Sequence, residues 1–298
     1  MANYSQAWSA TRPGCLILLL DQSGSMSDPF GNQMAGSGRR KCDMVATVLN
    51  GFLNELIVTN TIAQKDGTIM VRPRADVAVL GYEGSFVGPI LGGNLAGRAF
   101  VSLPDLQMNP LTIERRMKKE IDEIGMEVEI PVQFPVWVQP KAGGGTPMCA
   151  ALREANEMAL QWSLSHPDSY PPVIINVSDG MGNDGDIVNV ARQLSDISTN
   201  DGQALLFNVH ITDIHKGTVA YPAAEGELPN DRYAKKLFTI SSLIPETSRT
   251  LLQSLLGRQV FPGARGLIFN GDAASVRQMF VFASVPATKP LEQLEWDR

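Results

Sequence analysis

The sequence predicts an α/β fold in which helices cover both faces of a doubly wound, mostly parallel sheet. The first observation is a series of short apolar segments, such as residues 15–20 and 173–177, each long enough for one buried strand. The second is that amphipathic segments of helical length alternate with these strands along the chain. Because consecutive parallel strands need long crossover connections, which are usually helices, this alternation favours a parallel sheet.

The first half of the chain supplies two predicted strands with a helix between them. Residues 14–20 are the first predicted strand, and residues 76–82 are the second. The segment 41–58 predicts an amphipathic helix, whose apolar stripe is formed by Val45, Val48, Leu49, Phe52 and Leu56. Residues 27–40, which precede this helix, are rich in Gly, Ser and Pro and predict a loop.

Residues 86–140 form a connection far longer than the usual ~4–6 residues. Within it, 112–124 carries apolar residues at helical spacing, so a helix is one interpretation of that part. Residues 127–138 alternate between polar and apolar in the manner of a hairpin, and two prolines would confine that hairpin to the edge of a sheet. We expect the whole connection to be an elaboration beside the ligand-binding loops and not a separate domain.

The second half of the chain repeats the alternation. Predicted helices cover 147–164, 185–198, 247–256 and 272–284, and predicted strands cover 172–177, 204–211 and 266–269. Between the last two of these strands, the chain reads as a polar connection with a short apolar patch at 238–243. The sequence therefore predicts one domain over 12–285, with the elaboration 86–140 inside it, and a C-terminal tail over 286–298.

Charge and composition argue against several classes of protein. The net charge of −6 argues against a nucleic-acid binder, since such proteins usually present a basic face. The short basic cluster Arg39-Arg40-Lys41 predicts a solvated helix surface. No apolar run reaches the ~18 residues of a membrane-spanning helix, and the first residues lack the pattern of a secretory signal. The three cysteines fit no zinc-binding spacing. We expect a cytoplasmic protein that does not engage a membrane.

The sequence offers little support for an enzyme. Its three histidines are His166, His210 and His215, and none lies at a spacing that links it to a nucleophile. No Gly-x-Ser-x-Gly elbow is present. Only His215, just after a predicted strand, would lie near the ligand-binding edge of the sheet. We therefore expect a binding protein and not a catalyst.

Polar side chains follow two of the predicted strands. Asp21, Ser23 and Ser25 come directly after the first strand, and Asp179 comes after the strand 172–177. A third segment, the glycine run before Thr146, also precedes a predicted helix. Carboxylate and hydroxyl oxygens are the ligands that Mg²⁺ prefers, and the carboxyl ends of parallel strands gather at one edge. Asp21 or Ser25 alone would indicate no more than a helix N-cap, whereas the three segments together predict a metal site.

These three segments resemble the metal-ion-dependent adhesion site of the von Willebrand factor A (VWA) domain. That family combines Asp-x-Ser-x-Ser after the first strand with a later Thr and a later Asp. All five positions are present here: Asp21, Ser23, Ser25, Thr146 and Asp179. The likeness extends over roughly residues 12–285, with a long departure at about 86–140.

The resemblance implies a role for each residue. Ser23, Ser25 and Thr146 would hold the ion through neutral hydroxyls, and the two aspartates would act through water or through the serines. Such a shell leaves one position open, which an Asp or Glu of a protein partner would fill. Mg²⁺ is the expected ion because it keeps several waters, and Mn²⁺ or Ca²⁺ could replace it.

A narrower resemblance concerns residues 270–284 and 144–149. They are similar to segments of small bacterial cytoplasmic VWA proteins of tellurite-resistance and stress systems, which implies a protein kinase or phosphatase as a partner. The alternative interpretation of 270–284 is an ordinary amphipathic helix at the end of the domain, capped by Asp272. Two other functions stay open: a substrate-recognition subunit for a separate ATPase of the chelatase or MoxR type, and a hydrolase that uses the ion to activate water.

Overall fold

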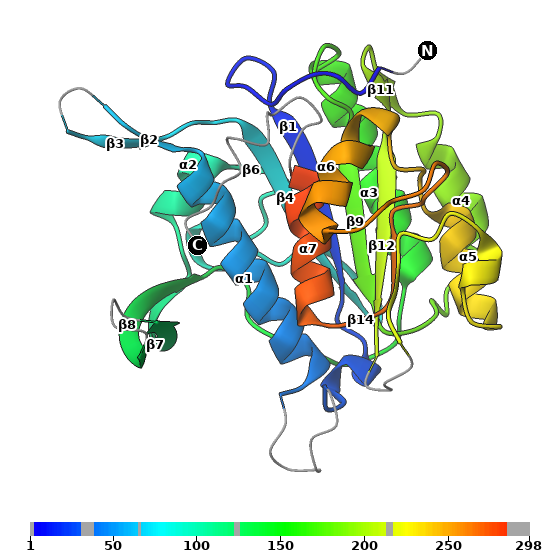
Figure 1. Cartoon of the computed structure of the whole chain (residues 1–298), viewed down its shortest axis with the longest axis horizontal. Helices are drawn as coiled ribbons and strands as arrows, with labels where there is room; N and C mark the ends of the chain where they lie inside the picture. The colour runs from blue at the N-terminus through cyan, green and yellow to red at the C-terminus, as the bar shows by residue number, and fades with distance from the viewer. Residues whose placement is uncertain (1–2, 31–38, 65–66, 122–125, 213–216, 285–298) are drawn as a thin grey trace.

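A mixed, mostly parallel sheet of eight strands forms the centre of the protein (Figure 1). The computed structural model describes residues 3–30, 39–64, 67–121, 126–212 and 217–284. Five neighbouring strands run parallel: β4 (Ala75–Glu83), β1 (Gly14–Asp21), β9 (Val173–Ser178), β12 (Leu205–Ile211) and β14 (Leu267–Gly271). Three short antiparallel strands flank them: β5 (Phe86–Pro89), β6 (Val101–Ser102) and β13 (Val219–Ala220).

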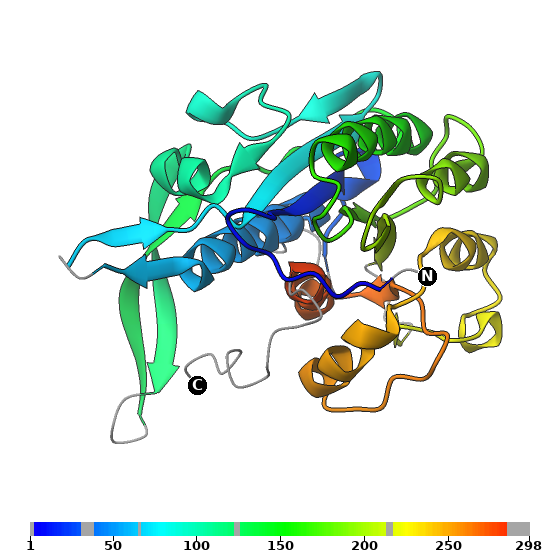
Figure 2. The same ribbon diagram turned by 90° about the horizontal axis from the view of Figure 1, so that it is seen from above.

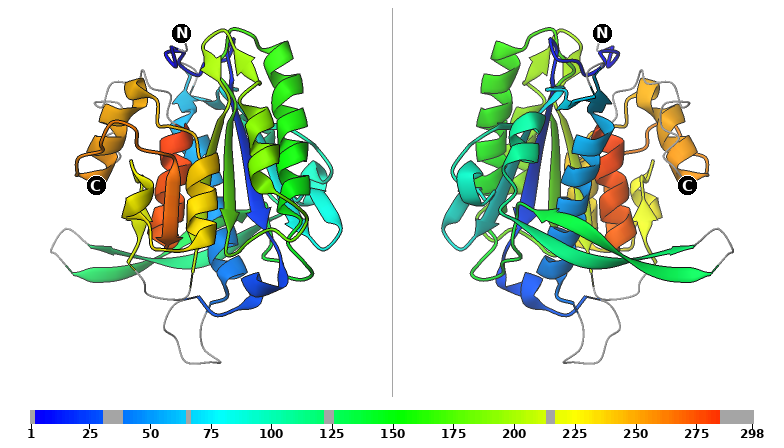
Figure 3. Two further views of the ribbon diagram at one scale, coloured as in Figure 1. Left: turned by 90° about the vertical axis from the view of Figure 1, so that its right-hand side faces the viewer. Right: turned by 90° about the vertical axis from the view of Figure 1, so that its left-hand side faces the viewer.

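Helices cover both faces of this sheet, as Figure 3 shows. One face packs against α1 (Lys41–Thr59), α2 (Leu103–Met108), α6 (Glu246–Leu256) and α7 (Ala273–Ser284). The other packs against α3 (Met148–Ser165), α4 (Ile187–Leu194) and α5 (Arg232–Ile240). Alternate residues of β1 enter the two cores, with Leu16, Leu18 and Leu20 in one and Ile17 and Leu19 in the other. The predicted doubly wound α/β fold is confirmed.

The elaboration contains a two-stranded arm that is separate from the main sheet. Strands β7 (Thr112–Ile121) and β8 (Glu127–Val136) pair only with each other and extend from the body of the protein (Figure 2). A helix over 112–124 is therefore wrong for 112–121, and residues 122–125 lie outside the described part. Cross-strand contacts such as the 2.6 Å ion pair between Lys119 and Glu127 stabilise a strand instead.

The predicted edge position of the two prolines is confirmed, because β8 pairs with β7 in a two-stranded sheet in which each strand is an edge. The predicted hairpin within 127–138 is instead a single strand, and the central sheet is not its partner. In a two-stranded ribbon, every second N–H of β8 points away from β7. Pro131 and Pro135, four residues apart, can therefore occupy such positions without loss of a ladder hydrogen bond.

Several short elements depart from the sequence-based prediction. The first half of the apolar patch at 238–243 belongs to helix α5, so the segment before β14 is more structured than expected. Helix α4 is shorter than the predicted 185–198, and the next residues form a small hairpin, β10 (Ser198–Thr199) and β11 (Gly202–Gln203). A second small hairpin, β2 (Thr61–Ala63) and β3 (Ile69–Val71), was not predicted. The 3₁₀ helices are Gly24–Ser27, Gly93–Leu95 and Glu225–Glu227.

Helix α1 is, within the described ranges, the one helix long and apolar enough to cross a membrane. Since 56% of that helical window is buried inside the fold, it packs as a core helix, which is compatible with a soluble protein. The cytoplasmic location stays a prediction. The tail 286–298 lies outside the described residues, and nothing tests the proposed domain limits of 12–285.

Candidate metal site

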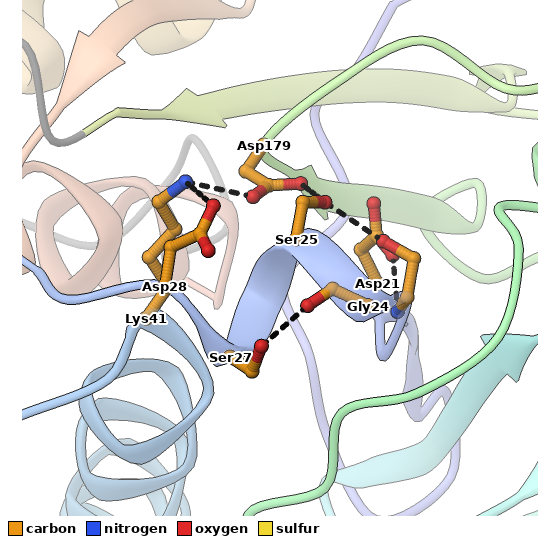
Figure 4. Close-up of polar contacts among 8 residues, drawn as sticks. Asp21, Gly24, Ser25, Ser27, Asp28, Lys41 and Asp179 are labelled. Atoms are coloured by element: carbon orange, nitrogen blue, oxygen red, sulfur yellow. Dashed lines mark hydrogen bonds and ion pairs between the residues drawn. The ribbon is translucent and has the colours of Figure 1, made fainter.

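Two of the three predicted segments meet at the carboxyl edge of the sheet because their strands are neighbours. Strand β1 pairs in parallel with β9, so the chain leaves both strands at the same edge. Asp21 is the last residue of β1, and Asp179 directly follows β9. Between Asp21 and the next helix, the chain forms the 3₁₀ turn Gly24–Ser27, which carries Ser25 toward Asp179 (Figure 4).

Hydrogen bonds connect four of the five predicted ligands. The Ser25 hydroxyl donates to Asp179 Oδ1 at 2.7 Å, and the Ser23 and Ser25 hydroxyl oxygens lie 3.2 Å apart. Asp21 Oδ1 accepts the Ser23 backbone N–H at 2.8 Å. Asp21 and Ser23 are both 2% exposed, whereas Ser25 is exposed. The cluster therefore has a buried floor and one side open to solvent.

The glycine run brings Thr146 to the site through its backbone. Gly143 N–H donates to Gln22 O at 2.7 Å, and Gly24 N–H donates to Gly144 O at 3.0 Å. Gly144 has a φ of 65°, and a Cβ there would lie 2.8 Å from Gly84 N, so only glycine suits this position. These bonds place the half-buried Thr146 two residues beyond the contact with Gly24.

Asp184 holds the loop that follows Asp179 against the start of helix α3. The sequence did not predict this contact. The two Asp184 carboxylate oxygens accept the backbone N–H groups of Cys149 and Ala150 at 2.9 and 2.8 Å. These donors belong to the first turn of α3, where a negative charge is favourable. Asn183 N–H also donates to Thr146 O at 3.0 Å. The segment after Asp179 thus fixes the start of α3 and the neighbouring Thr146.

Replacing Asp184 with Ala is expected to lower the free energy of unfolding by about 1–2 kcal/mol, because two helix N–H groups lose their acceptor. Urea unfolding measures this loss. Glu154→Ala is the matched control. Glu154 is an exposed acid on α3, the helix that Asp184 caps, and its replacement should change the free energy by less than about 0.5 kcal/mol. Equal stabilities of the two variants would contradict the role of Asp184 as a cap.

One oxygen of the site lacks a partner. Asp21 Oδ2 is buried and accepts no hydrogen bond from the described residues. Burial raises the pKa of Asp21 to about 6, hydrogen bonds from Ser23 oppose this, and the Asp179 charge adds to it. A buried carboxylate oxygen without a partner is costly, and a divalent cation would satisfy it.

The set of donors suits a hard cation such as Mg²⁺, which prefers carboxylate and hydroxyl oxygens. The described residues contain no group of three His, Cys, Asp or Glu side chains that could hold a metal ion. The predicted set contains two such side chains, Asp21 and Asp179, and three hydroxyl-bearing ones. Asp21, Ser23, Ser25 and Asp179 therefore fit the ion, and the role of all five residues as ligands, Thr146 included, stays a prediction.

Lys41 is a polar residue of the site that the sequence did not reveal. Its ammonium Nζ lies 2.9 Å from Asp179 Oδ2 and 3.7 Å from Asp28 Oδ2. The Lys41 side chain is only 6% exposed. The prediction of a solvated helix surface for the cluster at 39–41 is therefore wrong for Lys41. The cause is the 3₁₀ turn after Asp21, which brings the first residue of α1 over the site.

His210 lies beside Asp179, since its strand neighbour is Ser178 and it forms a hydrogen bond with the Asp179 backbone. His210 stacks on Phe269 with ring centroids 4.3 Å apart, and burial lowers its pKa to about 4. His166 stacks on Trp162 at the C-terminal end of α3, whereas Thr146 lies just before the N-terminal end of that helix. His215 lies outside the described residues. The neutral state of His210 at physiological pH suits its packed position.

No protein-family model matches the chain, and no curated protein matches it. Among solved structures, it is similar to the manganese-loaded Plasmodium vivax TRAP protein, with 17% identity and a TM-score of 0.31 over 69% of this chain and 60% of that one. It is also similar to the PilB minor pilin from Streptococcus sanguinis, with 9% identity and a TM-score of 0.44 over 96% of this chain and 63% of that one. A membrane-spanning protein from Vibrio fischeri gives 14% identity and a TM-score of 0.24, over 83% of this chain and 88% of that chain. The chain thus spans less than two thirds of the first two structures.

Proposed function

We propose that the chain is a metal-ion-dependent protein-interaction module of the VWA type. The observation that carries this proposal is the hydrogen-bonded series Asp21–Ser23–Ser25–Asp179, in which Ser25 is exposed and Asp21 Oδ2 is buried without a partner among the described residues. In the proposed site, Ser23, Ser25 and Thr146 hold a divalent cation, with Mg²⁺ the expected ion. When bound, the ion supplies a positive charge that attracts a carboxylate.

The side chains of the site differ in exposure, and their proposed roles differ accordingly. Asp21 and Ser23, which are buried, orient the floor of the site and exclude water from it. Ser25 is exposed and presents its hydroxyl at the rim, held by its bond to Asp179. An Asp or Glu side chain of a partner would enter from this open side. We propose binding without catalysis; what supports this is that His210, which lies beside Asp179, is packed against Phe269 and has a pKa lowered by burial to about 4.

The cellular setting is proposed from the sequence resemblance of residues 270–284 to bacterial stress-system members. It would place a protein kinase or phosphatase among the partners and the protein in the cytoplasm. The segment contains the end of β14 and the whole of helix α7, which Asp272 caps by accepting the Ser275 N–H at 2.8 Å.

The test is a pull-down from native lysate with wild-type protein and the Ser23→Ala/Ser25→Ala double variant, each in Mg²⁺ and in EDTA. We expect at least one partner whose recovery falls more than about tenfold in the variant and in EDTA, since a missing charge-assisted contact is worth about 1.4 kcal/mol or more. Mass spectrometry identifies the partner, and Asp→Asn or Glu→Gln changes in it locate the entering carboxylate.

Ser27→Ala is the matched control. Ser27 lies in the same turn and donates to Gly24 O at 2.7 Å, but it is not among the five predicted ligands. It should retain Mg²⁺-dependent capture. Identical recoveries from all proteins in both buffers would refute ion-bridged recognition.

A further inference from the structure

A buried cation already lies inside the acidic site. The Lys41 ammonium contacts Asp179 Oδ2 at 2.9 Å, and the Asp179 side chain is 1% exposed. The other oxygen of the same carboxylate accepts the Ser25 hydroxyl (Figure 4). Asp179 is thus shared between a predicted metal ligand and a lysine. A divalent cation at this site would meet a positive charge on the far side of Asp179.

The place of Lys41 in the chain is unfavourable for a cation by itself. Lys41 is the first residue of α1, where the helix dipole opposes positive charge. Its side chain is also buried, and a buried ammonium is tolerated only when it is paired. The pairing with Asp179 therefore compensates two costs at once. A second cation that binds Asp179 must therefore compete with the Lys41 ammonium for the carboxylate.

A second carboxylate lies within reach of the ammonium. Asp28 Oδ2 is 3.7 Å away on the outer side, and the Asp28 side chain is 56% exposed. The backbone keeps this pair in register, since Lys41 N–H donates to Asp28 O and Asp28 N–H donates to Ser25 O, both at 3.0 Å. A movement of the ammonium by about one atom diameter would exchange Asp179 for Asp28 without rearrangement of the turn.

We propose that Lys41 competes with the divalent cation for Asp179 and passes to Asp28 when the cation binds. This proposal rests on the proposed function and adds its regulation. Asp21, Asp179 and Asp28 together with the ammonium carry two negative units, so the loaded site is neutral with Lys41 and one unit negative without it. Lys41 thereby weakens ion binding but strengthens the attraction of the loaded site for a carboxylate. Ion and partner are predicted to bind cooperatively, each favouring the other.

Mn²⁺ binding to the full chain at pH 7.5, followed by the electron paramagnetic resonance signal of free Mn²⁺, tests the exchange. Lys41→Met should lower the dissociation constant about tenfold, which a unit charge a few Å from a divalent ion produces even at the dielectric constant of water. The same variant should bind acetate or a Glu-containing peptide more weakly once loaded with Mn²⁺. Lys141→Met is the matched control, because exposed Lys141 pairs with Glu83 and not with Asp179.

Asp28→Asn provides a second, independent arm that leaves the buried lysine in place. It should raise the dissociation constant for Mn²⁺ about threefold more in wild type than in Lys41→Met. Loss of the Asp28 charge acts in both proteins, whereas loss of the acceptor for the displaced ammonium acts only in wild type. If Lys41→Met does not fold, as judged by circular dichroism, Lys41→Gln replaces it in both arms.

The outcomes separate the exchange from the proposed function. Wild type that binds Mn²⁺ with Lys41→Met binding no tighter, or with Asp28→Asn acting equally in both proteins, overturns the exchange and leaves the metal site intact. Binding by Lys41→Met alone supports competition in its strongest form and overturns the proposed function of the wild-type site. Absence of binding in every variant overturns both.

Discussion

Asp21→Asn is expected to raise the free energy of unfolding of the metal-free protein by about 2–3 kcal/mol at pH 7.5, while divalent-cation binding falls at least about tenfold. Asp21 is 2% exposed, and its Oδ2 has no partner among the described residues. Folding therefore places an ionised carboxylate in a site that only partly compensates it. Asparagine keeps the shape and the Oδ1 acceptor for Ser23 but carries no charge.

The pH dependence provides the signature of this effect. Burial raises the pKa of Asp21 from 3.8 to about 6, so the folded state binds the proton more tightly than the unfolded state does. The resulting stabilisation is complete below pH 3.8 and is lost as the pH rises through about 6. The difference in stability between variant and wild type should thus be near zero at pH 4 and reach its full value by about pH 7.

Urea unfolding in EDTA at several pH values between 4 and 7.5 measures this difference. The lowered pKa of His210 makes both proteins less stable in acid, and it cancels when wild type is subtracted from the variant. Adding Mg²⁺ should stabilise wild type and leave Asp21→Asn unchanged. A stability difference that stays constant with pH would show that Asp21 is compensated in the folded protein and would remove the argument for a cation there.

The strands that could be predicted are those whose own residues determine their secondary structure. Strands β1 and β9 are apolar throughout and of strand length, which suits the centre of a parallel sheet. The polar residues that follow them were predicted to converge because parallel strands end at one edge. Asp21, Ser25 and Asp179 do converge. Their capacity to bind a metal is a separate matter that stays a prediction.

The elements that could not be predicted depend on partners far away in the sequence. The spacing of apolar residues in β7 suits a helix, and only its pairing with β8 selects the strand. Lys41 lies 138 residues from Asp179, so a local pattern shows it as part of an ordinary basic cluster. Asp184 likewise caps a helix that begins 36 residues earlier, at Met148. In each case, tertiary contact overrides the local signal.

Trp137→Ala is expected to lower the free energy of unfolding by about 3–5 kcal/mol, the cost typical of removing a large buried aromatic side chain. Trp137 directly follows β8 and is 1% exposed, in the core that includes α1 and α2. Its indole N–H donates to Leu106 O at 2.8 Å, and its backbone N–H donates to Asn50 Oδ1 at 2.8 Å. The base of the arm is thus an integral part of the core.

Two further variants separate packing from hydrogen bonding and from the arm itself. Trp137→Phe keeps most of the apolar volume and loses the indole donor, so it should cost about 1–3 kcal/mol. Met117→Ala lies on β7, where the side chain is 57% exposed, and should change the stability by less than about 0.5 kcal/mol. Urea unfolding of all three tests the ranking. If Trp137→Ala were as stable as Met117→Ala, the whole elaboration would be peripheral to the core. The ranking predicted here instead means that the arm is anchored through Trp137 and Asn50 on α1, the helix that begins at Lys41 beside the candidate metal site.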